Sequence, residues 1–351
     1  MPAVSIDTFF ACSLMVLLVL SAMTATARIL QPIVNTMASH EAAQRFGEIA
    51  KHVLLHAGRP ADWGQDGQTV PEEFGLADAV AESPYALDVD KVSRLNSENI
   101  YCLSYAQIFT SLRSPDLSFR IEIKPVFNVE LNLTSVIQDS DETIYMFQAA
   151  TKRDEGSPVS TSLKAFVLAE NLLRAYTLQN TGGRVDFNIT VPTSLESPAL
   201  LVVFAKSTCN SRIVSYSVYP LTVQGGLFPR GAFLKLSPIN HTLIVKPTSS
   251  GAVLTGAYAL TFNGLWQLTQ TGSNTFRIPE FTDASPTVLM VFGLDSTRHF
   301  AGWTVYPQIP IHAGVDFTSL RSASDVYAFE HLVSIGYGIY KCTIFIGGPK
   351  T

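Results

Sequence analysis

The residues able to do chemistry are scattered along this chain, and their spacing builds no recognisable catalytic set. His52 and His56 lie four residues apart, a spacing that can hold a metal ion on one face of a helix. No acidic residue accompanies them in the pattern of a zinc protease, so a solvated helix face is the preferred interpretation. The sequence also has no Gly-x-Ser-x-Gly nucleophile elbow, no phosphate-binding loop and no dinucleotide-binding motif. We therefore expect no enzyme activity and no catalytic, cofactor or metal site.

Charge excludes a further class of function. The chain has 24 basic and 29 acidic side chains, a net charge of −5, whereas a nucleic-acid binder needs a basic face. Asp139-Ser140-Asp141-Glu142 offers the carboxylate oxygens that calcium takes, but a solvated turn is the preferred interpretation. Charged residues make up only 15% of the chain, against about 25% in an ordinary soluble domain. Because the net charge is negative, nucleic acid is not an expected partner.

Two kinds of modification remain open. Three glycosylation sequons begin at Asn132, Asn188 and Asn240. Apart from Cys12 near the N-terminus, the cysteines are Cys102, Cys209 and Cys342, so that at most one bridge can form among these three. If the body lies outside the cell, Cys102 with Cys342 is the disulfide to test first. Three free thiols are the alternative.

The first part of the chain is a candidate membrane anchor. Twenty residues without a charge separate Asp7 from Arg28, enough for a helix of about 30 Å, the thickness of a bilayer core. A cleaved secretory signal ending near Ala25-Thr26-Ala27 is the alternative, but such a signal has a basic start and a shorter apolar run. Apolar residues then recur at three- and four-residue steps over 29–57, and Gly58 is a stop signal. We predict one long helix over 1–58.

This helix resembles the N-terminal helix of type IV pilins and of pilin-like surface proteins of archaea. In that family an acidic residue stands near position five of the mature chain, and Asp7 would take that place if the mature chain began at Ala3. The resemblance implies that the Asp7 carboxylate pairs with a neighbouring subunit's terminal amine and so sets assembly. Asp62-Trp63-Gly64 and the segment 87–91 are similar to segments of the same group.

The segment 59–115 reads as a packed connector with short helices. It is dense in Gly, Pro and Asp at first, and Trp63 and Phe74 can pin it down. Asp88 or Asp90 can cap a short helix, and a second helical stretch follows near Leu103–Leu112.

After Pro115 the hydrophobic period changes from helical to two. The run Phe119–Leu131 alternates as a half-buried antiparallel strand, and short strands follow at regular spacing. The segment 162–176 can also be read as a helix. We predict an α+β, mostly β chain, in which the long helix precedes two tandem antiparallel sandwiches of the immunoglobulin or fibronectin kind.

An internal repeat supports two related domains. The segments 187–192, 197–204 and 218–220 have counterparts at 276–279, 285–292 and 305–307, about 88 residues later. Two chance-similar strand pairs are the alternative. We place the sandwiches at 116–222 and 223–315 and expect them to form a stalk. Residues 316–351 look like a hairpin turning near Gly336–Gly338, which returns to pair with the Phe119–Leu131 strand in a sheet near the membrane.

These features favour a structural cell-surface protein, single-pass in the cell membrane, with its body outside the cell. It would be a pilin-like filament subunit or a membrane-anchored adhesin. Its partners would be the lipid bilayer, copies of itself or other pilin-like subunits through the N-terminal helix, and surface glycans. The alternative is a ligand-binding or sensor ectodomain on a single-pass anchor, with no assembly role. Trp266 and Trp303 can contact sugar, although core packing is the default for both.

Overall fold

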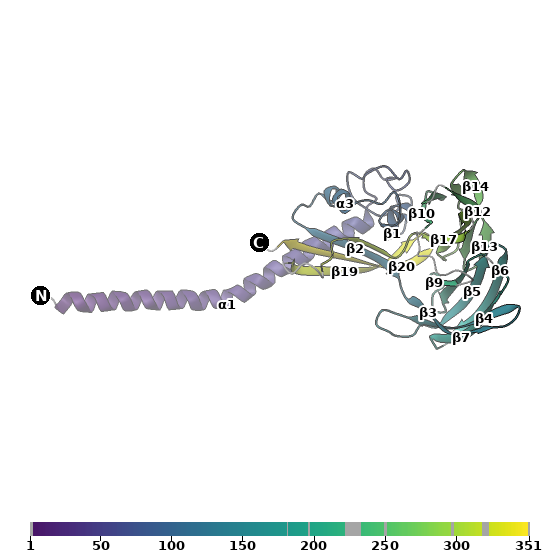
Figure 1. Cartoon of the computed structure of the whole chain (residues 1–351). Helices are drawn as coiled ribbons and strands as arrows, with labels where there is room; N and C mark the ends of the chain where they lie inside the picture. The colour runs from purple at the N-terminus through teal and green to yellow at the C-terminus, as the bar shows by residue number, and fades with distance from the viewer. Residues whose placement is uncertain are drawn as a thin grey trace. The chain divides into compact units, whose positions relative to one another are not determined.

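The computed structural model describes residues 3–180, 182–195, 197–221, 233–248, 251–295, 298–317 and 323–349. Within these ranges the chain is mostly β, with three helices and twenty strands (Figure 1). Contacts divide the chain into two units, residues 1–51 and 52–351. The first unit is helical, and the second contains every strand.

Helix α1 (Ala3–Leu55) is continuous over 53 residues and confirms the predicted long helix. It passes through Pro32 and ends three residues before Gly58, whose φ of 77° is left-handed. The stretch Phe9–Thr26 has a mean hydropathy of 2.1, and none of it is buried. Its hydroxyls bond to carbonyls of the preceding turn, as Thr24 Oγ1 does to Leu20 O at 2.9 Å, so they need no water. By length and composition this stretch can cross a membrane, although a signal sequence would pass the same test.

The connector folds around three large buried side chains, Trp63, Lys91 and Arg94. Lys91 Nζ donates to the carbonyls of Ala57 and Ala77 at 2.8 and 2.9 Å. Arg94 donates to the carbonyl of Trp63, and its guanidinium carbon lies 5.4 Å from the centre of that ring. Because every charged hydrogen bond here ends on a backbone carbonyl, the two cations hold the irregular chain in place. The connector is therefore packed, as its aromatic residues predict.

The two short helices lie where their caps predict. Helix α2 (Val89–Ser93) is capped by the Asp88 carboxylate, which accepts from two backbone nitrogens. Helix α3 (Tyr105–Leu112) begins with a capping box made by Ser104 and Gln107. The glycine of Asp62-Trp63-Gly64 has a steric reason, because a Cβ at Gly64 would lie 2.7 Å from the backbone nitrogen of Lys91. That three-residue motif thus has a packing role.

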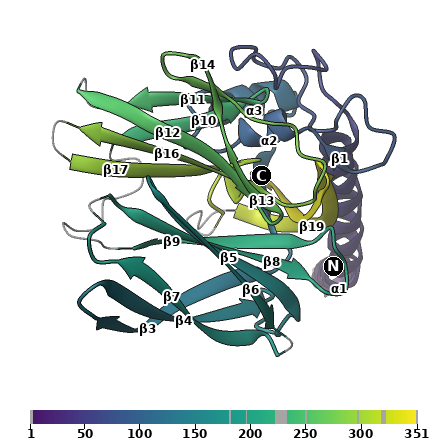
Figure 2. The ribbon, with the colours of Figure 1, turned by 90° about the vertical axis from the view of Figure 1, so that its right-hand side faces the viewer.

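Two antiparallel sheets, here called the first sheet pair, share one hydrophobic core (Figure 2). One has the order β3-β4-β7 and the other β6-β5-β8-β9. Their bounds are β3 (Asn128–Gln138), β4 (Glu142–Lys152), β5 (Thr161–Ala169), β6 (Leu172–Asn180), β7 (Arg184–Pro192), β8 (Ala199–Ser207) and β9 (Val214–Leu221). The helical alternative for 162–176 is wrong, because β5 and β6 form a hairpin there.

The second sheet pair has the orders β10-β11-β15-β14 and β13-β12-β16-β17 around its own core. Its strands are β10 (Leu234–Ile239), β11 (Thr242–Pro247), β12 (Ala252–Thr261), β13 (Gly264–Gln267), β14 (Thr269–Gly272), β15 (Thr275–Arg277), β16 (Thr287–Asp295) and β17 (Arg298–Tyr306). Strands β15, β16 and β17 hold the sheet positions that β7, β8 and β9 hold in the first pair. The repeat in the sequence therefore corresponds to equivalent strands.

The two sheet pairs lie side by side, so the expected end-to-end stalk is wrong. The sheet containing β8 packs its outer face on the sheet containing β16, in a core to which Phe204 and Phe292 contribute. Alternate residues of β8 and β16 belong to this shared core and to the core of their own pair. Both strands are therefore apolar on both faces. This double burial explains why their runs of Leu, Val and Met show no alternation.

A five-stranded sheet gathers segments from distant parts of the sequence in the order β1-β19-β20-β2-β18. Its strands are β1 (Ala86–Leu87), β2 (Ser118–Pro125), β18 (Ile311–Gly314), β19 (Ala323–Ile335) and β20 (Gly338–Pro349). The predicted C-terminal hairpin is confirmed, and β20 pairs with β2. The single strand expected over Phe119–Leu131 is two strands, since the chain leaves this sheet after β2 and enters the first sheet pair as β3.

The shared core between the sheet pairs gives a stability prediction. Phe292→Ala should lower the free energy of unfolding by about 3–5 kcal/mol, because the ring is 1% exposed and its loss leaves a cavity. Leu173→Ala, at a side chain 51% exposed, is the control and should cost less than about 0.5 kcal/mol. Denaturant unfolding of the full chain in detergent, followed by tryptophan fluorescence, measures both. Equal effects of the two substitutions would contradict the packing of these sheets.

Candidate functional site

The residues predicted to carry function fall in different parts of the fold. Asp7 lies in the first turns of α1, and its side chain is outside the part that the structure describes. Asn132 in β3 and Asn188 in β7 are exposed on the two strands that flank β4, opposite Gln148 and Met146. Asn240 is exposed in the turn between β10 and β11, with a φ of 45°. All three sequon asparagines are thus open to solvent.

The expected Cys102–Cys342 disulfide is not formed. All four cysteines are free thiols, and Cys102 and Cys209 are exposed. Cys342 lies opposite His331 and Ile123 in the middle of the five-stranded sheet, where burial raises the pKa of its thiol to about 12. Cys102 is exposed whereas Cys342 is fully buried.

The other candidates for chemistry are separate from one another. The rings of His52 and His56 stack with centroids 4.2 Å apart, and His52 Nε2 lies 3.2 Å from Glu73 Oε1. The acidic run begins in the turn between β3 and β4, where Asp139 accepts from the backbone of Ser140. No group of three or more metal-binding side chains is found in the part of the chain that the structure describes. These positions do not form a site.

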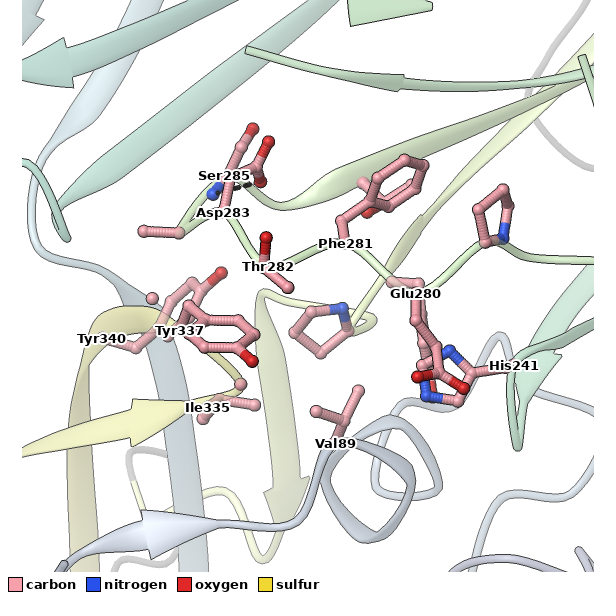
Figure 3. Close-up of a pocket in the computed structure, with 17 residues that line it drawn as sticks. Val89, His241, Glu280, Phe281, Thr282, Asp283, Ser285, Ile335, Tyr337 and Tyr340 are labelled. Atoms are coloured by element: carbon pink, nitrogen blue, oxygen red, sulfur yellow. Dashed lines mark hydrogen bonds between the residues drawn. The ribbon is translucent and has the colours of Figure 1, made fainter. Parts of the chain in front are cut away.

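One cavity lies where three distant segments meet (Figure 3). It has a volume of about 290 Å³, near the lower end of the usual range for small-molecule sites. Its walls come from α2, from the 279–287 loop between β15 and β16, and from the turn of the β19–β20 hairpin. His241 and Tyr306 complete the lining. We call this cavity the junction pocket.

Hydrogen bonds fix the 279–287 loop that forms one wall. Asp283 accepts from Thr261 Oγ1 at 3.0 Å, from Asn263 Nδ2 at 2.8 Å and from the backbone nitrogen of Ser285 at 3.0 Å. Ile278 N donates to the carbonyl of His241 at 2.7 Å, just before the loop. The loop is therefore tied at both ends, which preforms the pocket wall.

A close backbone approach and two hydrogen bonds fix the turn of the β19–β20 hairpin, which forms another wall of the pocket. A Cβ at Gly338 would lie 3.0 Å from the carbonyl oxygen of Ala284, so glycine allows the hairpin to approach the 279–287 loop. Arg212 Nε donates to the carbonyl of Tyr337 at 3.1 Å, and Ile339 N donates to the carbonyl of Arg212 at 3.0 Å. The loop between β8 and β9 thus anchors the hairpin. The pocket needs all these segments in place.

A buried carboxylate joins the connector to the pocket floor. Asp90 Oδ1 accepts from Tyr306 Oη and from Asn240 N, each at 2.8 Å. Burial raises the pKa of Asp90, against the lowering effect of these hydrogen bonds. Burial also raises the pKa of Tyr306, helped by the Asp90 charge. The phenol therefore stays protonated and donates to the carboxylate.

Sequence reasoning missed the junction pocket. Its residues come from segments that are up to about 250 positions apart, and the only local signal was the Gly-Tyr-Gly turn of the hairpin at Gly336–Gly338. Trp266, considered above for sugar contact, packs its ring on Phe281 with centroids 4.6 Å apart. Its side chain is 36% exposed and lies behind a pocket residue without lining the pocket.

Comparisons with known proteins add little. No family model matches the sequence, and no curated protein matches it either. Among solved structures, HBP35 of Porphyromonas gingivalis is similar with 12% sequence identity and a TM-score of 0.20. The similarity covers 52% of this chain and 64% of that chain, less than two thirds of its length. A TM-score this low does not establish a shared fold, so the site rests on its own geometry.

The raised pKa of Asp90 predicts a pH-dependent effect of substitution. A raised pKa means that the folded protein binds this proton more tightly, so wild-type stability falls as pH rises through the folded pKa. Asp90→Asn keeps the acceptor oxygen without the charge. Its stability relative to wild type should therefore increase from pH 4 to pH 7 in denaturant unfolding.

Asp90→Ala is the matched comparison, because it leaves Tyr306 Oη and Asn240 N without their acceptor. It should cost about 2–4 kcal/mol at pH 4, and the cost should shrink toward pH 7 by the same amount as for Asp90→Asn, because both variants lack the titrating carboxyl. If Asp90→Asn lowers the stability as much as Asp90→Ala does, the junction needs the carboxylate itself. Our inference that a neutral acceptor oxygen can replace it would then be wrong.

Proposed function

We propose that this chain is a membrane-anchored cell-surface protein, with a β-rich body outside the cell and an N-terminal helix that holds it in the bilayer. The observation that carries the proposal is the Phe9–Thr26 stretch of α1, which is apolar and fully unburied. An exposed surface of this size has no stable place in water, whereas lipid would cover it. A cleaved signal would need no helix beyond the apolar stretch, but α1 runs on to Leu55.

The body, in this proposal, contains two sandwiches of the immunoglobulin or fibronectin kind. In each sheet pair, one sheet begins with the first two strands of the pair, β3 and β4 or β10 and β11. The other sheet has the order β6-β5-β8-β9 or β13-β12-β16-β17. Shared cores and the repeated strand order support two related domains. Such domains commonly serve at cell surfaces, although the fold alone does not give a function.

The outward orientation can be tested with the two exposed thiols. In intact cells, a membrane-impermeant maleimide should label the protein at Cys102 and Cys209, because both are exposed on the body. Cys342 is buried, and its raised pKa keeps the unreactive thiol form. A Cys102→Ser/Cys209→Ser double variant should lose the label and serves as the control. Labelling only after permeabilisation would place the body in the cytoplasm, and recovery of the labelled protein in the medium would show a cleaved signal.

Assembly through α1 is the second part of the proposal, and it follows from the pilin-like N-terminal sequence. A carboxylate at Asp7 near the lipid would need a cationic partner, and the terminal amine of a neighbouring subunit is the nearest one available to a pilin-like helix. Copies of the chain or other pilin-like subunits are the partners of such an assembly, and surface glycans would be the partners of an adhesin.

Asp7→Asn tests this role. Membrane-fraction abundance should stay the same or rise, because the substitution removes a charge from the edge of the span. Filament yield should fall strongly, because the ion pair that sets the axial register is lost. Glu41→Gln, farther along α1, is the control. Unchanged filaments would contradict the role of Asp7, and no filaments from either protein would contradict assembly and leave a lone anchor.

A lone, ligand-binding ectodomain is the second candidate function. The junction pocket favours it, because its walls are preformed by hydrogen bonds and three segments converge there. The filament subunit and the lone ectodomain both have the body outside the cell, so both predict the same maleimide labelling. Only the filament subunit predicts filaments that depend on Asp7.

A further inference from the structure

The chemistry of the junction pocket points to one class of ligand. Its lining combines the aromatic rings of Phe281, Tyr337 and Tyr340 with the carboxylates of Glu280 and Asp283. Among the described residues that line it there is no lysine and no arginine. Figure 3 shows Tyr337 and Tyr340 on one side, with Glu280 beside His241 on the other. The pocket therefore offers the exposed ring of Tyr337 and two carboxylates, with no lysine or arginine in its lining.

The two carboxylates differ in what they can do for a ligand. Asp283 accepts three hydrogen bonds from its own surroundings, so its charge contributes to the field while its oxygens are engaged. Glu280 is exposed, and the structure gives it no hydrogen bond or ion pair with any described residue. A free carboxylate at the mouth of an aromatic pocket attracts cations and repels anions.

The two tyrosines differ in exposure. Tyr337 is 53% exposed, whereas Tyr340 is 3% exposed and burial raises the pKa of its phenol. A neutral phenol presents a negative ring face, which attracts a cation placed over it. The large exposed ring of Tyr337 is also unusual at the turn of a hairpin, where small polar residues are more common.

We propose that the junction pocket binds a small organic cation, an ammonium group on a short apolar body. The rings would contact the cationic group, and Glu280 would supply the opposite charge. A neutral sugar could also stack on an exposed ring, but it would gain nothing from the carboxylate charge of the lining. The cavity of about 290 Å³ limits the ligand to a small molecule. This inference does not depend on assembly or on the orientation of the body.

Choline and its uncharged isostere, 3,3-dimethyl-1-butanol, make a direct test. Both are titrated into the full chain in a polyoxyethylene detergent, which has neither a sugar nor a choline headgroup. Calorimetry measures binding, and the fluorescence of Trp266, in ring contact with Phe281, reports from the pocket. We expect choline to bind at least tenfold more tightly than the isostere, and methyl glucoside and acetate to bind more weakly than choline.

Variants separate the charge from the rings. Glu280→Gln should weaken choline binding about tenfold and leave the isostere unchanged, whereas Glu82→Gln, an exposed carboxylate in the connector, should have no effect. Tyr337→Leu should weaken choline binding about tenfold, and Tyr337→Phe should keep it, because phenylalanine retains the ring face. Unchanged unfolding midpoints confirm that the variants fold.

Three results would overturn the proposal. Equal binding of choline and the isostere would make the pocket an apolar site without selectivity for cations. Tighter binding of methyl glucoside than of choline would assign the pocket to carbohydrate. No detectable binding of choline at about 100 mM would show that the pocket does not take small organic cations.

Discussion

The packing of one sheet pair on the other holds the rest of the body in place. The sheet with β8 and the sheet with β16 bury their outer faces against each other, so each of these strands is enclosed on both sides. Burial of apolar surface contributes about 25 cal/mol for each Å² removed from water, so this shared core stabilises the contact between the pairs. It fixes the loops at the ends of β8 and β16 relative to one another. The junction pocket is built from segments that these loops position.

Polar contacts then decide how the connector attaches to this apolar framework. Lys91 and Arg94 bond mainly to backbone carbonyls, and Asp90 bonds to Tyr306 and Asn240. Burial lowers the pKa of Lys91 and raises that of Asp90, so both ions are held against a desolvation cost. Such groups contribute little net stability but permit only one arrangement, because any other leaves them unsatisfied. The connector is therefore specified more by hydrogen bonds than by hydrophobic area.

The helix and the body follow different physical rules. In α1 the stretch Phe9–Thr26 satisfies its backbone and its serine and threonine hydroxyls within the helix and is otherwise apolar, which suits lipid. In the body, exposed positions such as Asn188 in β7 alternate with buried ones, which suits water on one face of a sheet. A chain with both patterns is suited to a bilayer and to the solvent beside it.

Local patterns in the sequence determined what depends on neighbouring residues alone. The apolar period predicted α1, a capping aspartate (Asp88 or Asp90) predicted α2, and alternation predicted β2. The helical stretch near Leu103–Leu112 and the hairpin turning near Gly336–Gly338 predicted α3 and the β19–β20 pair. The repeat predicted equivalent strands. These features follow from 3.6- and two-residue periods and from caps, all of which are read over a few positions.

Tertiary structure alone decided the rest. The sheet pairs lie side by side because the apolar outer faces of β8 and β16 pack together. The unbroken apolar runs of these strands indicate burial on both faces, but they do not say which sheet covers each face. Cys342 is buried by its neighbouring strands, a fact that cysteine spacing does not contain. The junction pocket joins Val89, Glu280 and Tyr337, and only the folded chain brings them together. Contacts between distant segments depend on which surfaces fit, and no local period records that.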